Sequence, residues 1–243
     1  MKLTTLLLIV FSISSFVSNG QKTTDSLIKS NCEKVEDFVP ENWKILQQTT
    51  GDLNKDKIND VALIIQATDT SKIEYLIGEE EEKYTVDYND RILLVLIKDT
   101  VENKYVLKGQ SSSFIINRYS PKMADPFQEL IISKNILKIN FFLWYSMGSW
   151  YQTDLTYVFR FQEDKLTLIG AEYNEVHRGN SNGVHRSFNF STKKMSETQS
   201  ELNSNGDLFD KNTEWFDLPI QELKTIETLT KPLDWEPIIG KQI

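Results

Sequence analysis

The chain has 243 residues, of which 40% are hydrophobic and 26% are charged, and its formal net charge is −8 at pH 7. The acidic residues are spread along the chain, and no basic stripe is present to replace the counterions of a phosphate backbone, so nucleic acid is disfavoured as a partner. The single cysteine, Cys32, excludes an internal disulfide. Stability must therefore come from a hydrophobic core, from a metal, or from both.

The first 20 residues have the organisation of an export signal. Lys2 gives a positive start, residues 6–10 begin an apolar stretch, and small residues precede Gln21. That stretch is interrupted by serines and is shorter than the ~20 apolar residues of a membrane-spanning helix, and no later segment is longer. We expect a signal peptide over 1–20, no transmembrane segment, and an exported protein, periplasmic or extracellular. A lipoprotein is the weaker alternative, because Cys32 lies well past the apolar stretch.

The remainder, 21–243, is expected to form a single β-rich domain. Residues 23–39 carry apolar side chains at near-helical spacing and precede Pro40, which predicts a short helix or a docked leader. Two continuous apolar runs, 61–67 and 92–97, predict central strands covered on both faces. We expect a loop between these two strands.

The centre of the chain alternates apolar and polar residues with period two. This pattern covers 137–145 and, after a break at Gly148, 153–161, and it predicts two long antiparallel strands. Further strands are expected over 166–176 and 184–191.

Short connections indicate how these strands pair. Ser133–Asn135 and Glu163–Lys165 predict tight hairpin turns, because Asn and Asp tolerate the dihedral angles that such turns need. Sequential neighbours should then pair. We predict a mainly β fold, an antiparallel meander arranged as a curved sheet, a sandwich or a propeller-like body, with short helices near both termini, the C-terminal one within 218–229.

The most specific motif is the segment 52–60, in which oxygen-bearing side chains recur at the first, third, fifth and ninth positions. Calcium takes about six to eight oxygen ligands, and a curled loop turns alternate residues towards one centre. An apolar strand follows directly and would hold the ninth-position carboxylate in place. The motif predicts a structural Ca²⁺ site. Its expected ligands are the side chains of Asp52, Asn54, Asp56 and Asp60 and the main-chain carbonyl of Ile58.

This motif resembles the calcium loops of FG-GAP or VCBS repeats, which run Asp-x-Asn-x-Asp-Gly-x-x-Asp ahead of an apolar strand. The resemblance covers Gly51 to Ile65 and includes neither a whole repeat nor tandem copies. Lys57 stands where the family pattern has Gly, and a side chain at that sharp turn costs ~1 kcal/mol or more in backbone strain. The alternative is that Asp and Asn build a solvent-exposed β-turn.

The wider layout is similar to uncharacterised exported proteins of Bacteroidetes-type bacteria. In those proteins a Trp-containing segment leads into Gly-Asp-Leu-Asn-Lys-Asp, and a β-rich body follows. The matching residues are 43–56, Asp125–Phe127, and 157–161 followed by Leu168–Gly170. The resemblance implies export and β architecture and carries no known activity.

Three aromatic residues beside the Ser146–Ser149 turn are candidates for ligand binding: Trp144, Trp150 and Tyr151. Aromatic rings at a hairpin tip can stack on a sugar or dock a protein partner. The alternative is that they fill the core of the sheet. Exposure of all three as one patch would favour binding, and separate burial would contradict it.

Evidence for an enzyme is thinner. His177 and His185 flank a Gly/Asn loop and could face each other across a hairpin as a metal pair or an acid–base pair, or they are exposed strand ends. No serine-hydrolase, zinc-protease or phosphate-loop motif occurs, whereas the paired carboxylates of a glycosidase have no fixed spacing in sequence. We therefore predict an exported calcium-binding β domain that binds an unknown protein or carbohydrate. The alternative is a secreted hydrolase that uses carboxylates.

Overall fold

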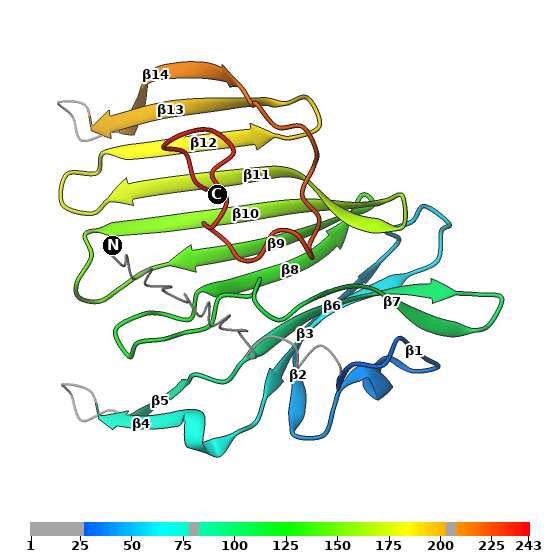
Figure 1. The fold of residues 1–243 in the computed structure, drawn as a ribbon. Helices are drawn as coiled ribbons and strands as arrows, with labels where there is room; N and C mark the ends of the chain where they lie inside the picture. Colours follow the sequence, from blue (N-terminus) through cyan, green and yellow to red (C-terminus); the bar gives the residue numbers. More distant parts are fainter. Residues whose placement is uncertain (1–26, 78–82, 203–207) are drawn as a thin grey trace, which may run out of the picture.

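The computed structural model describes residues 27–77, 83–202 and 208–243, and its fold is mainly antiparallel β structure (Figure 1). One sheet has the order β1 (Asn31–Cys32), β7 (Lys104–Ser111), β6 (Arg91–Asp99), β3 (Asp60–Ala67) and β2 (Trp43–Gly51). The larger sheet follows chain order: β8 (Phe127–Ser133), β9 (Ile136–Leu143), β10 (Tyr151–Gln162), β11 (Lys165–His177), β12 (Gly183–Asn189), β13 (Lys194–Leu202) and β14 (Leu208–Asp217). The predicted mainly β, antiparallel fold is confirmed. The expected signal peptide lies outside the described residues.

The larger sheet is a meander joined by short turns. Lys134 and Asn135 between β8 and β9 have φ of 52° and 59°, and Glu163 and Asp164 between β10 and β11 have φ of 51° and 59°. Two consecutive positive φ angles mark the turns whose twist matches that of paired strands. Both predicted hairpins are thus present, and they fix the register of the long central strands.

The short helices predicted near both termini are not found among the described residues. The helical segments of this part of the chain include two short 3₁₀ turns, η2 (Val35–Phe38) and η3 (Thr70–Lys72), and no helix of seven or more residues. Asn31 and Cys32 pair with β7, so the backbone is extended where the first helix was expected. Near the C-terminus the Leu229 amide donates to the Thr225 carbonyl at 2.8 Å, which makes one turn and no helix. No helix among these residues has the length and apolar character needed to cross a membrane.

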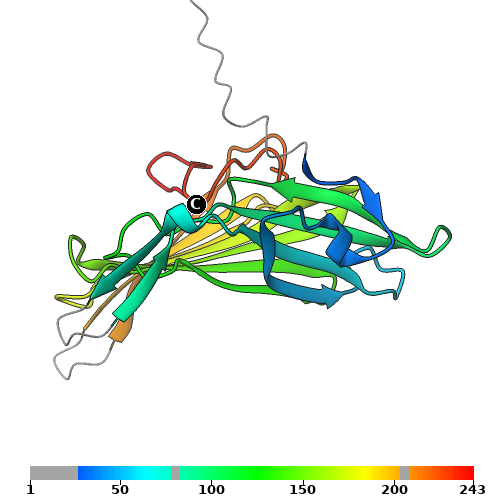
Figure 2. The ribbon, with the colours of Figure 1, turned by 90° about the horizontal axis from the view of Figure 1, so that it is seen from below.

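The segment between the two central strands of the smaller sheet is also different from the expected loop. It forms the hairpin β4 (Ile73–Ile77) and β5 (Lys83–Asp87), a separate two-stranded sheet that extends from the body (Figures 1 and 2). Tyr75 and Ile77 are exposed, so apolar and polar residues do not alternate between a core and solvent. The hairpin therefore lacks the period-two signal that identifies the other strands.

The central strands β3 and β6 are covered on both faces, as their apolar runs predict. Val61, Leu63 and Ile65 face a small cluster to which the N-terminal segment contributes Val35 and Phe38. The described part of this segment, from residue 27 on, thus docks on the sheet, with Val35 and Phe38 at the ends of the 3₁₀ turn η2. The opposite face belongs to the main core.

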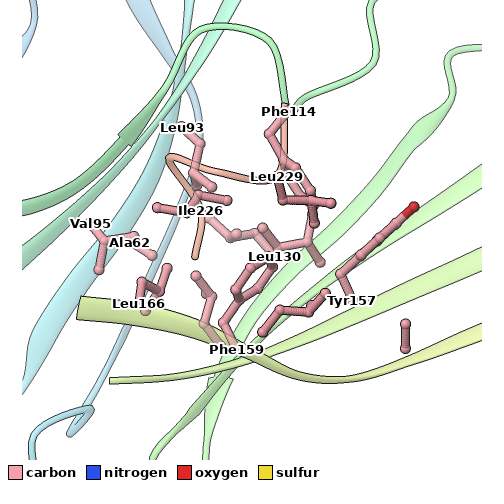
Figure 3. Close-up of a cluster of buried hydrophobic side chains, with 14 of the residues drawn as sticks. Ala62, Leu93, Val95, Phe114, Leu130, Tyr157, Phe159, Leu166, Ile226 and Leu229 are labelled. Atoms are coloured by element: carbon pink, nitrogen blue, oxygen red, sulfur yellow. The ribbon is translucent and has the colours of Figure 1, made fainter. Parts of the chain in front are cut away.

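The main core lies between the two sheets and under the C-terminal segment (Figure 3). Phe114 packs edge-on against Tyr157 and Phe159, with ring centroids 5.1 Å and 5.5 Å apart. Ile226 and Leu229 close the cluster from the C-terminal side. We call the side of the larger sheet that carries Leu155, Tyr157 and Phe159 the inner face, and the opposite side the outer face.

Candidate functional site

The Asp52–Asp60 loop connects β2 to β3, and its last residue is fixed inside the protein. Asp60 is 0% exposed, and its carboxylate accepts hydrogen bonds from the amides of Leu53 at 2.8 Å and Lys98 at 3.0 Å. The pKa of Asp60 is raised, because burial outweighs the hydrogen bonds from backbone amides that lower it. The charge of Asp56 raises it further. The ninth position of the motif is therefore anchored where the chain enters the buried strand.

The exposed part of the loop is held in a tight curl by hydrogen bonds between its carboxylates and its own backbone amides. The carboxylate of Asp52 accepts from the amides of Lys55 at 2.6 Å and Lys57 at 3.0 Å, and that of Asp56 accepts from the Ile58 amide at 2.7 Å. Lys55 and Lys57 adopt φ of 70° and 71°. Lys57, which replaces the Gly of the family pattern, thus stands in the left-handed conformation that favours glycine.

The fit of the loop to calcium is incomplete in this conformation. The side chains of Asn54 and Asp56 are joined at 2.9 Å on the exposed side, whereas both oxygens of Asp60 accept backbone amides on the buried side. Within 27–77, 83–202 and 208–243, no group of three or more His, Cys, Asp or Glu residues is arranged to hold a metal. The ligand set Asp52, Asn54, Asp56, Ile58 and Asp60 stays a prediction.

The second candidate site is an aromatic patch at the end of β10 and β11. The Trp150 ring stacks on the His177 ring with centroids 6.1 Å apart and an angle of 21°, and the Tyr151 ring meets His177 edge-on at 4.9 Å. Trp150 is 66% exposed and Tyr151 is 49% exposed. We call these three residues the aromatic patch. It is held in place by strand pairing, because Tyr151 and His177 are register partners.

The loop that carries Trp150 is fixed by Arg178. The Arg178 amide donates to the Trp150 carbonyl at 2.7 Å. The Arg178 guanidinium donates to the carbonyls of Tyr145, at 2.9 Å, and Ser149. Trp144 packs against this guanidinium, 5.3 Å from the ring centroid, and is half-buried. The structure thus brings Trp150 and Tyr151 together and places Trp144 in a separate contact.

The two histidines do not face each other. His177 pairs with Tyr151 on the inner face, whereas His185 pairs with Asn174 on the outer face and lies 3.0 Å from a carboxylate oxygen of Glu172. The strand register puts them on opposite sides of the sheet, because side chains alternate with period two. The hypothesis of a histidine pair is wrong.

Sequence reasoning missed two residues of this site. His177 was considered only as a partner of His185, and Arg178 was not considered. The signal for both was the register of the predicted hairpin, which sets His177 opposite Tyr151 and places Arg178 at the turn. The alternative of a carboxylate hydrolase stays a prediction.

No family model matches the chain, and neither the comparison with curated proteins nor that with solved structures finds a match.

Proposed function

We propose that this protein is an exported binding module that holds a carbohydrate against the aromatic patch. The observation that carries the proposal is the stacked group of Trp150, His177 and Tyr151, two of whose rings are largely open to solvent. The C–H face of a sugar ring packs on such aromatic faces, while a ring nitrogen and a phenol bond its hydroxyls. Export brings the patch to the compartment in which glycans of the cell surface and surroundings occur.

The patch is preorganised, which favours affinity. Arg178 ties the Trp150 loop to two strand ends, and Gly179 leaves room for the stack, since a Cβ there would lie 3.0 Å from Cε1 of His177 and 3.5 Å from Cε3 of Trp150. Side chains that are already ordered lose little entropy when a ligand binds. A protein ligand would use the same rings, and binding of a protein in place of any glycan is the competing outcome of the test.

The test is a screen of immobilised glycans followed by titration monitored by tryptophan fluorescence. We expect Trp150→Ala and Tyr151→Ala each to lower affinity about tenfold or more, because each removes an aromatic contact surface. Trp215→Ala is the matched control, since Trp215 is 72% exposed on the edge strand β14, away from the patch. Equal affinities for the wild type and both patch variants would contradict the proposal.

We also infer that the Asp52–Asp60 loop is a structural calcium site. Support comes from the oxygen-bearing residues at alternate positions of one curled loop, the left-handed Lys57 at the turn, and the anchoring of Asp60 at the start of β3. Asp52, Asn54, Asp56, Asp60 and the Ile58 carbonyl would hold the ion. Bound Ca²⁺ would offset the repulsion between the three carboxylates and so stabilise the entrance to the buried strand.

Thermal melting with calcium and with a chelator tests the metal site. A site that is saturated at 100 times its Kd adds about 2.7 kcal/mol to the free energy of unfolding. We expect a higher Tm with calcium for the wild type and for Asp154→Ala, a control on the outer face, but not for Asp56→Ala. A wild-type Tm that does not respond to calcium would refute the assignment.

A further inference from the structure

Two cavities lie next to each other on the inner face of the larger sheet, beside the segment 230–243, which we call the C-terminal strap. The first, of about 400 Å³, is mostly apolar, and the second, of about 310 Å³, is mostly polar. The apolar pocket is lined by Ile115, Ile116, Met123, Leu143, Tyr145 and Leu233 among others. The polar pocket is lined by Thr153, Tyr173, Glu175, Arg186, Glu236 and Gln242 among others.

The two pockets form one groove. Leu233 lines both of them, and Leu143 of the apolar pocket is the register partner of Thr153 of the polar pocket. The floors of the two pockets therefore lie on neighbouring strands, β9 for the first and β10, β11 and β12 for the second, and Leu233 borders both. Three strand spacings correspond to about 14 Å, which is longer than a single pyranose ring.

The aromatic patch lies one step along the strands from the polar pocket. Tyr151 and His177 are register partners, as are Thr153 and Glu175, so the two pairs are consecutive steps on the same face of β10 and β11. Such a step is about 6.6 Å along the strand. One ligand can therefore contact the aromatic rings and the polar pocket at the same time.

The wall of the groove is fixed by an unusual backbone conformation. Leu233 has φ of 67°, and its amide donates to the hydroxyl of buried Tyr157 at 3.2 Å. Further along the strap, Lys241 binds Glu197 at 2.7 Å, and Glu197 also binds Arg186 at 2.6 Å. A branched side chain in the left-handed region persists only where its surroundings impose it, and such strain is concentrated at binding sites.

The polar groups of the groove suit vicinal hydroxyls. Glu175 accepts from the Tyr173 hydroxyl at 2.8 Å and keeps further lone pairs, while Arg186 and Gln242 supply donors.

We propose that the groove binds an oligosaccharide of two or more neutral sugar rings that continues from the aromatic patch, an inference that rests on the proposed function. One ring packs its C–H face on Tyr151 and Trp150, and the next ring bonds its hydroxyls to Glu175 and its neighbours. The ligand runs along β10 and β11 from the patch to the polar pocket beside the C-terminal strap. The number of sugar rings in the ligand, in addition to the identity of the terminal sugar, determines affinity.

Isothermal titration calorimetry tests this with soluble mono- to tetrasaccharides of β-1,4-linked glucose, N-acetylglucosamine, mannose and xylose and of α-1,4-linked glucose. We expect affinity to rise tenfold or more from a monosaccharide to the disaccharide or trisaccharide of one series. Glu175→Gln should remove most of that rise, because it removes the acceptor that the second ring uses. Glu172→Gln is the matched control, because Glu172 lies on the same strand but on the outer face, bonded to Ser187.

The outcomes separate the two proposals, provided that circular dichroism melts show each variant to be folded. Binding that requires Trp150 but is independent of chain length and of Glu175 overturns the groove and leaves the aromatic patch. Loss of binding in Glu175→Gln with no effect of Trp150→Ala overturns the patch and, with it, the proposed path of the ligand from the patch into the groove. A panel in which no sugar binds overturns both.

Discussion

Strand β10 has two ends with the same sequence pattern and opposite surroundings. Towards its C-terminal end, Leu155, Tyr157 and Phe159 alternate with polar residues and are 1%, 0% and 0% exposed. Towards its N-terminal end, Tyr151 continues the same alternation on the same face, yet it is 49% exposed. Period two therefore tells which face a side chain occupies, and what lies above that face decides whether it is core or available to a ligand.

The cover comes from distant parts of the chain. Phe114 reaches Tyr157 and Phe159 from the connection after β7, and the bond from Leu233 to Tyr157 spans 76 residues of sequence. The smaller sheet and residues 226–229 cover the part of the inner face that carries Tyr157 and Phe159, and the C-terminal strap borders the pocket beside Thr153 and Glu175. A local pattern carries no information about where such a distant cover stops.

The largest expected contrast is between two aromatic residues of this strand. Phe159→Ala removes a buried ring at the centre of the core and should lower the free energy of unfolding by about 4 kcal/mol. Tyr151→Ala should change it by less than about 0.5 kcal/mol, because the ring packs mainly on His177 and solvent. Urea denaturation of the two variants measures both values. Similar losses would mean that the open end is part of the core.

The ion pairs under the C-terminal strap should show the next largest effect. Glu197 is bound by Arg186 and Lys241, and all three side chains are at most 18% exposed. Glu197→Ala leaves two largely buried cations without their partner and should cost about 3 kcal/mol by urea denaturation. Glu214→Ala, an exposed acid opposite Glu197 on β14, is the control and should be nearly neutral. A neutral Glu197→Ala would show that the strap does not depend on these pairs.

The same carboxylate predicts a pH dependence. Burial alone would raise the pKa of Glu197, but the hydrogen bonds and charges of Arg186 and Lys241 hold it below its ordinary value of 4.5. A lowered folded-state pKa contributes stability that is complete above about 4.5 and is lost as the pH falls through the folded-state pKa. The wild type should therefore lose more stability than Glu197→Gln on acidification below that pH. Parallel stability profiles for the two proteins would contradict this.

The anchor of the strap is expected to have a smaller effect. Tyr157→Phe removes the hydroxyl that accepts the Leu233 amide and leaves that part-buried amide without its partner, which should cost about 1 kcal/mol. Hydrogen exchange should become faster at the Leu233 amide and remain unchanged in β10. If exchange at Leu233 is unaffected, the left-handed conformation is imposed by neighbouring contacts and not by Tyr157.

The sequence could predict the elements whose signals are local. Strands form over the apolar runs that end at Ala67 and Ile97 and over the apolar–polar alternation around Phe141 and Phe159. Asn135 and Asp164 occupy the expected turns. The N-terminal helix is not found, because the apolar spacing that predicts it also suits a short strand, Asn31–Cys32, followed by a 3₁₀ turn docked on a sheet. At the site, Tyr151 and Trp150 could be found from the sequence. The groove could not, because Leu233 and Glu175 meet only through the path of the C-terminal strap.

The smallest expected effect concerns the Asp52–Asp60 loop, which lies beside the covered part of the larger sheet. There Leu53 enters the main core, and the Asn135 side chain donates to the Asp52 carbonyl at 2.8 Å. Lys57→Gly relieves a left-handed φ of 71° at an exposed residue and should raise stability by roughly 0.5–1 kcal/mol without metal. Lys55→Gly removes the same charge and a similar strain at a position that the calcium pattern does not assign to glycine. Melting curves with and without calcium should therefore show equal gains in chelator and a larger calcium-dependent gain for Lys57→Gly. Equal stability gains for the two variants in calcium would indicate that the loop is a simple turn that does not bind the ion. Packing alone would then stabilise this end of the sheet.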